Sequence, residues 1–185
     1  MLKTIALTIL FVASEFQEPL KATRLPDSAG TISAARLRHR IPKEARKAYV
    51  GAVNIFKRDT KPDVEAAVVE LERAITIDPE FADALGLLGS LNFRLMRFDE
   101  AAAAYRRAVD VDPEFARWHS ELGWALFALH DDAGAQESAR RALRLQPANA
   151  SAHLLLGVLL SPSAATRPEG LWHLTEGSYY LQRPR

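Results

Sequence analysis

Three short stretches of the chain decide its fold: Ile75-Thr76-Ile77-Asp78-Pro79, Val109-Asp110-Val111-Asp112-Pro113 and Leu143-Arg144-Leu145-Gln146-Pro147. Their prolines lie 34 residues apart twice, without a gap. The same interval separates three other columns, which are Ala74, Ala108 and Ala142, then Leu88-Gly89, Leu122-Gly123 and Leu156-Gly157, then Ala67, Ala101 and Ala135. A fixed period of this length indicates a stack of repeated supersecondary units.

Each repeat contains two windows in which apolar residues recur at helical spacing. In one repeat the windows are 81–96 and 98–111. Apolar residues at this spacing predict two amphipathic helices that bury one face each. The short polar stretches between windows predict turns, so each repeat is expected to be a helical hairpin.

The turns carry residues that favour helix starts. Asp78, Asp112 and Asn149 are predicted N-caps of the helices that follow them, because a short polar side chain there can accept a bond from a free backbone N–H. His130-Asp131-Asp132 lies at a predicted turn between helices, where an Asp is interpreted as a cap.

These columns resemble the tetratricopeptide repeat, whose signature is WxxLGxxY followed by a small alanine, an aromatic residue and a proline. The match rests on the Leu-Gly, alanine and proline columns, since His119 and His153 occupy the opening tryptophan column. The resemblance covers residues 43–182. It implies an all-α fold, a right-handed solenoid of about four helical hairpins preceded by an irregular N-terminal segment.

The four hairpins differ in regularity. The two central ones fit the period without insertions, whereas the outer two have longer turns, and Gly170 and Gly177 stand where alanine is expected. The predicted helical windows and hairpins are 43–57 with 64–77, then 82–114, then 116–147, then 149–160 with 168–181. Terminal repeats are commonly atypical.

The N-terminal region precedes the repeats. Lys3 followed by the apolar run 5–13 makes 1–14 a signal-like segment, so we expect export to the periplasm, with a cytoplasmic chain as the alternative. The lead-in to the repeats also resembles that of exported bacterial tetratricopeptide proteins. Nine apolar residues are too few to span a membrane. Residues 15–42 are predicted to be a linker with a short strand within 31–38.

Composition and motifs exclude several classes of function. The chain has 31 alanines and 25 leucines but no cysteine, which excludes disulfides, thiol catalysis and cysteine-ligated zinc. It has neither a GxxxxGK nor a GxGxxG stretch to hold phosphates. His119 and His153 lack the further repeating ligands that a metal site needs, so they are interpreted as packing residues. We therefore expect no enzyme activity, cofactor, metal or small-molecule substrate.

The resemblance implies a binding surface, because the first helix of each tetratricopeptide hairpin lines the concave side. The predicted groove residues are Asp83, Gly86, Ser90, Phe93, Arg94, Arg117, Ser120, Trp124, Phe127, Leu154 and Val158. They form an aromatic floor with a basic rim, which favours an apolar or amphipathic segment of an unknown partner protein. The alternative is that Trp124 and Phe127 are buried beneath neighbouring repeats.

The residues on these helices do not favour one known type of ligand, a peptide with a terminal carboxylate. Some tetratricopeptide proteins hold a peptide carboxylate with lysine and asparagine side chains. Gly86 and Ser90 stand at such positions here, and Glu121 lies nearby. The sequence therefore does not support binding of a chaperone tail.

Two alternative functions remain open. The first is self-association into a homo-oligomer through the apolar last helix, around Leu171, Trp172, Leu174, Tyr179 and Tyr180. The second is contact with nucleic acid or an anionic surface through the basic segment 36–47. Nucleic acid is the less favoured partner, because Glu44 interrupts this segment and residues 48–185 carry 15 basic against 19 acidic side chains.

Overall fold

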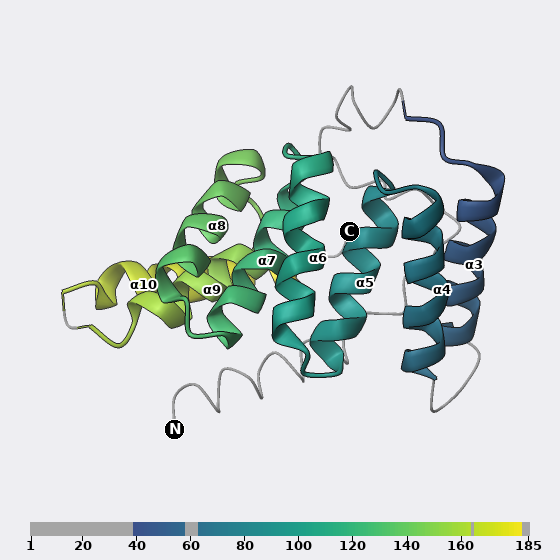
Figure 1. Cartoon of the computed structure of the whole chain (residues 1–185). Coiled ribbons are helices and arrows are strands. Elements are labelled where there is room, and N and C mark those ends of the chain that lie inside the picture. Colours follow the sequence, from purple (N-terminus) through teal and green to yellow (C-terminus); the bar gives the residue numbers. More distant parts are fainter. Residues whose placement is uncertain (1–38, 58–62, 164, 183–185) are drawn as a thin grey trace.

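A computed structural model describes residues 39–57, 63–163 and 165–182. These residues form eight helices, which Figure 1 labels α3 to α10. Their bounds are α3 Lys43–Lys57, α4 Val64–Ile77, α5 Ala82–Arg94, α6 Phe98–Val111, α7 Ala116–Ala128, α8 Asp132–Leu145, α9 Ala150–Leu160 and α10 Arg167–Gln182. The expectations for the signal-like segment 1–14 and for a strand within 31–38 lie outside the described residues.

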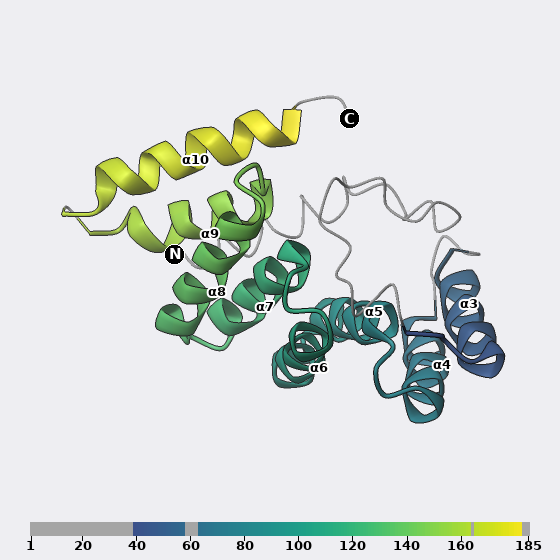
Figure 2. The ribbon, with the colours of Figure 1, turned by 90° about the horizontal axis from the view of Figure 1, so that it is seen from above.

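The helices pack as four consecutive hairpins, α3 with α4, α5 with α6, α7 with α8 and α9 with α10. Seen from above, the hairpins follow a curve, with α5, α7 and α9 on its inner side and α4, α6 and α8 on its outer side (Figure 2). The predicted all-α fold of about four hairpins is confirmed. The predicted bounds of the second helix, 64–77, are also those of α4.

Side-chain caps start three of the helices. The side chain of Asp63 accepts a bond of 3.0 Å from the Ala66 N–H at the start of α4. Asp131 accepts one of 2.9 Å from the Gly134 N–H at α8, and Asn149 accepts one of 2.9 Å from the Ala152 N–H at α9. The predicted cap at Asn149 is confirmed, and of the two aspartates in the turn before α8 it is Asp131 that caps the helix.

The predicted N-caps at Asp78 and Asp112 are wrong, because these residues end α4 and α6 instead. A proline disfavours helical backbone at the residue before it, and Asp78 is accordingly extended, with φ −138° and ψ 91°. The Asp78 carboxylate accepts a bond of 3.2 Å from the Glu80 N–H within the turn. The next helix starts only after Phe81, which makes no side-chain cap bond.

Two inner helices, α5 and α7, are each followed by a residue in the left-handed backbone conformation. Met96 after α5 and His130 after α7 have φ values of 60° and 65° and lie one repeat apart. In each case the next N–H reaches back to the last turn, Arg97 to the Asn92 carbonyl and Asp131 to the Leu126 carbonyl, both at 2.9 Å. This is the Schellman ending, which turns the chain sharply into the outer helix.

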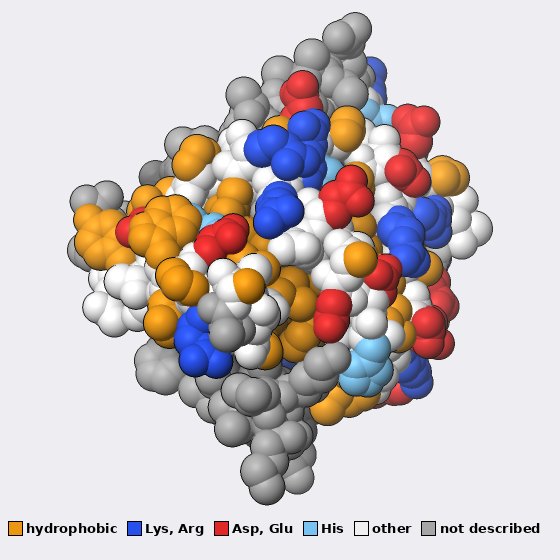
Figure 3. All heavy atoms as spheres, turned by 90° about the vertical axis from the view of Figure 1, so that its left-hand side faces the viewer, with side chains coloured by type: hydrophobic (Ala, Val, Ile, Leu, Met, Phe, Trp, Pro, Cys, Tyr) orange, Lys and Arg blue, Asp and Glu red, His pale blue; other side chains and the backbone are white. Residues whose placement is uncertain are grey.

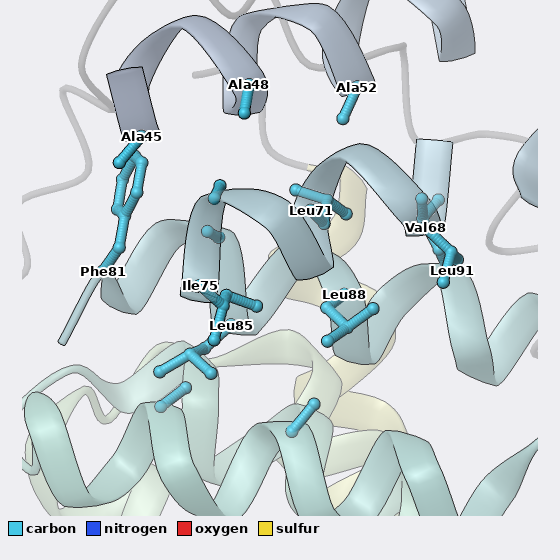
Figure 4. Packing of buried hydrophobic residues seen from close by; sticks show 14 of the residues in the cluster. Ala45, Ala48, Ala52, Val68, Leu71, Ile75, Phe81, Leu85, Leu88 and Leu91 are labelled. Atoms are coloured by element: carbon cyan, nitrogen blue, oxygen red, sulfur yellow. The ribbon is translucent and has the colours of Figure 1, made fainter. Parts of the chain in front are cut away.

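The core lies between the inner and outer helices and runs along the whole curve. At one end, Ala45, Ala48 and Ala52 of α3 face the large side chains of the next two helices (Figure 4). Leu71, Leu85 and Leu91 there are fully buried. Alanine in one layer opposite leucine in the next fills the space between helices without gaps.

The last hairpin is packed closely because of its glycines. A Cβ placed on Gly157 of α9 would lie 2.5 Å from the Leu174 side chain, and one on Gly177 of α10 would lie 2.9 Å from Leu154. One on Gly170 would lie 2.7 Å from the backbone N of Ser161. Gly170 and Gly177, which deviate from the expected alanine, therefore allow α10 to approach α9 more closely than alanine would.

Candidate interaction surface

All the residues predicted to line the groove lie on inner helices. Asp83, Gly86, Ser90, Phe93 and Arg94 belong to α5, Arg117, Ser120, Trp124 and Phe127 belong to α7, and Leu154 and Val158 belong to α9. The structure thus places the predicted set along one side of the curve (Figure 2). Their exposure to solvent differs, and that difference decides which of them a partner can reach.

Four predicted groove residues are buried: Gly86, which is described below, and three residues of α7. Trp124 is 7% exposed, Phe127 is 5% exposed and Ser120 is 1% exposed. The Trp124 ring meets Phe127 edge to face, with ring centroids 5.9 Å apart, and its indole N–H donates to Ser151 Oγ at 2.9 Å. The expectation of an open aromatic floor at these residues is wrong, because α9 of the next hairpin supplies the covering contact.

Other predicted residues stay accessible. Arg94 is exposed, and its guanidinium lies over the ring of Phe56 of α3, 5.0 Å from the ring centroid. The remaining accessible side chains are half-buried and include both polar and apolar ones, namely Asp83, Ser90, Phe93, Arg117, Leu154 and Val158. The inner helices therefore carry two accessible arginines, Arg94 and Arg117, and three half-buried apolar side chains, Phe93, Leu154 and Val158.

A polar cluster links the second and third hairpins. The Tyr105 hydroxyl of α6 lies 3.0 Å from Ser90 Oγ of α5, which itself donates to the Gly86 carbonyl at 3.1 Å. Burial, and then the negative charge of Glu121, raise the pKa of Tyr105, so its hydroxyl stays protonated. The sequence placed Tyr105 in an apolar helical face and gave no signal for this polar contact.

Glu121 of α7 completes this cluster. Burial raises the pKa of its carboxyl, while the charge of Arg117 and a hydrogen bond with Tyr105 lower it. Arg117 Nε lies 3.9 Å from Glu121 Oε1, and the Arg117 guanidinium lies over Trp118, 5.8 Å from the ring centroid. This separation is too long for a hydrogen bond, so the contact between Arg117 and Glu121 is a loose ion pair.

Trp118 fills the space beside Gly86. The ring is 4% exposed and packs edge to face on Phe115, with centroids 4.9 Å apart. A Cβ on Gly86 would overlap this ring. Gly86, predicted as a groove residue, is therefore buried and acts as a spacer between α5 and α7.

Asp83 lines a cavity of about 430 Å³ at the end of the second hairpin. Glu80, Asp110 and His39 also line it. His39 Nε2 lies 2.8 and 3.0 Å from the two carboxylate oxygens of Asp78, which attaches the residues before α3 to the turn before α5. His39, which the sequence placed in the basic segment 36–47, thus makes an intramolecular contact.

The two histidines of the tryptophan column have one structural role. His119 Nε2 lies 2.9 Å from the Pro113 carbonyl oxygen, and His153 Nε2 lies 2.9 Å from the Pro147 carbonyl oxygen. Each ring therefore ties its helix to the turn before it. Within the described ranges, no three His, Cys, Asp or Glu side chains come together as a metal site. None of the helices α3 to α10 has the length and hydropathy to cross a membrane.

The α10 residues that were predicted to mediate self-association fall into two groups, one exposed and one packed against α9. Leu171, Trp172 and Tyr179 are 54%, 54% and 49% exposed. Leu174 instead packs on Gly157, and Tyr180 stacks on His153 at 5.7 Å between centroids. Figure 3 faces the end of the molecule that carries α10 and shows hydrophobic side chains gathered on this surface.

Sequence profiles of known families and solved structures of other proteins both support the fold. Residues 63–125 and 121–160 each match a tetratricopeptide repeat profile. No curated protein matches the sequence.

Similar solved structures include a crystal structure of MamA, with a TM-score of 0.65 and 18% identity over 76% of this chain and 80% of that one. MamA 41-end from Desulfovibrio magneticus RS-1 gives a TM-score of 0.64 and 17% identity over 75% of this chain and 76% of that one. The first TPR of Spaghetti (RPAP3), bound to the HSP90 peptide SRMEEVD, gives 0.56 and 21% identity over 71% and 94%. At these identities the likeness concerns the fold.

Proposed function

The chain is a tetratricopeptide repeat protein, and from this we propose that it is a non-catalytic scaffold whose inner side binds an amphipathic segment of a partner protein. Domains of this family generally serve protein–protein interaction. A structure of the same fold holds a peptide, which supports a peptide segment as the ligand class. Gly86 and Ser90 still argue against that particular chaperone peptide.

One observation carries the proposal. Arg94 and Arg117 lie on the neighbouring inner helices α5 and α7, and half-buried Phe93, Leu154 and Val158 lie on the inner helices α5 and α9. Arginine is enriched among the residues that carry most of the binding energy at interfaces. A segment with acidic residues for the arginines and apolar residues for the other three would satisfy both kinds of group. Trp124 and Phe127 would support this surface from below.

Photo-crosslinking in the native host tests the proposal. A photoreactive amino acid replaces Arg94, and the matched control carries it at Arg107, an exposed arginine of α6 on the outer layer. We expect one partner protein to be captured from position 94 and not from position 107. Adding Arg117→Glu to the first chain should reduce the capture at least about tenfold, because an acidic segment then faces a carboxylate.

Two results would refute the site. One is equal capture of the same protein from both positions. The other is capture from position 94 that Arg117→Glu leaves unchanged while the variant keeps its far-ultraviolet circular dichroism spectrum.

A further inference from the structure

The outward face of α10 carries no charged residue between Pro168 and Gln182. Its members recur at helical spacing and are all exposed: Pro168, Leu171, Trp172, Thr175, Ser178, Tyr179 and Gln182, which we call the α10 stripe. The other outer helices differ, since α6 exposes Arg106 and Arg107, and α8 exposes Glu137 and Arg140. Among the described helices α10 packs extensively only against α9, whereas α4, α6 and α8 each also pack against the next hairpin.

The large side chains of the α10 stripe are held from beneath. Trp172 meets His173 and His153 edge to face, with centroids 4.7 and 5.5 Å apart. Tyr179 meets Tyr180 edge to face at 5.4 Å, and Tyr180 stacks on His153. Side chains that are already positioned lose less conformational freedom when a partner covers them.

If two copies of α10 pack antiparallel, the α10 stripe of one copy can face the same stripe of the other. A two-fold axis passing through Thr175 places Leu171 against Tyr179, Trp172 against Ser178 and Thr175 against its own copy. Large side chains then face smaller or complementary ones, and the central threonines allow the helices to approach. An uncharged surface also pairs with its own copy without leaving any charge buried.

We propose that the α10 stripe is a homodimer interface, in which two copies of the chain pack α10 against α10 about a two-fold axis near Thr175. A helix of 16 residues is about 24 Å long, so the contact lies at the small end of stable interfaces. The dimer is therefore expected to be reversible and to depend on protein concentration. An anionic lipid surface fits less well, because Glu169 and Glu176 flank the stripe and Arg167 is the only cation in α10.

Sedimentation velocity of the full chain, from micromolar to sub-millimolar concentration, tests the association. We expect a monomer at low concentration and a dimer at high concentration. Trp172→Glu and Leu171→Glu should each abolish the dimer. The matched control is Val69→Glu, since Val69 is an apolar side chain on α4 that is 61% exposed, and this variant should dimerise as the parent does.

Cysteine crosslinking tests the position of the axis. The chain has no cysteine, so Thr175→Cys introduces a single thiol that faces its own copy across the axis. A disulfide needs Cα atoms within about 7 Å. With diamide as the oxidant, we expect the Thr175→Cys chain to form a covalent dimer at least about tenfold faster than the Val69→Cys chain.

Three outcomes would overturn the proposal. They are a monomer at every concentration, a dimer that survives both glutamate variants, and a Thr175→Cys chain that crosslinks no faster than the Val69→Cys chain. The test is separate from the proposed partner site, because Trp172→Glu should leave capture from position 94 unchanged.

Discussion

Gly86 sets the distance between the second and third hairpins, because the Trp118 ring occupies the volume that any larger residue needs. Gly86→Ala should therefore destabilise the fold by about 1–3 kcal/mol, although alanine is normally the better helix former. The matched control is Gly51→Ala in α3, where the nearest atom would be Glu70 Oε2 at an ordinary 3.6 Å. The control should be neutral or stabilising by up to about 1 kcal/mol.

Urea unfolding followed by far-ultraviolet circular dichroism measures both changes. A Gly86→Ala chain that is as stable as the Gly51→Ala chain would show that Trp118 can move aside at no cost, and would contradict the assigned role of Gly86.

Single residues also show where sequence reasoning stops. The cap at Asn149, and a cap from one of the two aspartates after His130, were predictable because the pattern is local. The burial of Trp124 was not predictable from its own repeat, because it depends on Ser151 of another hairpin. Arg94 stays exposed because its long side chain keeps a charged head at the surface. The sequence thus predicts on which side of the curve a residue lies better than it predicts whether solvent reaches it.

At the scale of elements, a histidine pair joins α9 to α10. His153 donates from Nε2 to the Pro147 carbonyl, and its Nδ1 lies 2.9 Å from His173 Nδ1. Glu169 lies 3.9 Å from His173 Nε2, and Arg140 of α8 lies 3.8 Å from Glu169. Between the two Nδ1 atoms, one donates and the other accepts.

The pair predicts a pH dependence of the last hairpin. Burial, then the proximity of His153, lower the pKa of His173 below 6.5, and Arg140 acts in the same direction against Glu169. The folded state therefore binds fewer protons than the unfolded one, so this contribution to stability is complete above pH 6.5 and falls as the pH drops below it.

Imidazole NMR titration of 15N-labelled protein checks this expectation. The His173 signal should titrate with a midpoint below 6.5, and His173→Gln should weaken the acid sensitivity of the α10 amide signals. A midpoint at or above 6.5 would mean that Glu169 outweighs burial and that acid strengthens the contact between α9 and α10.

At the scale of the whole molecule, each helix packs mainly on the helices next to it in sequence. Stability in such an array is a sum over hairpins and over the boundaries between them. Hydrogen exchange followed by mass spectrometry at low protein concentration should find the slowest exchange in α5 to α8 and faster exchange in α3 and α10. Uniform protection from α3 to α10 would instead indicate a single cooperative unit.

The same regularity explains why so much of the fold was predictable. Columns 34 residues apart fix the type, number and approximate bounds of the helices, as α4 shows. The turns before α5 and α7 were harder to predict. Because Asp78 is extended and a proline follows it, the next helix starts several residues later, at a position that no periodic column marks. The solvent exposure of the predicted groove residues was the hardest property to predict, since it depends on contacts between repeats.

Packing between neighbours also determines how the molecule would respond to a mechanical load. No pair of distant helices among those described holds the two ends together, so tension applied along the chain acts on one hairpin boundary at a time. A stretched molecule should lengthen in steps that each release one hairpin, and it should recover its length hairpin by hairpin when the force is removed. A scaffold of this construction can yield at one end while the helices at the other end keep their form.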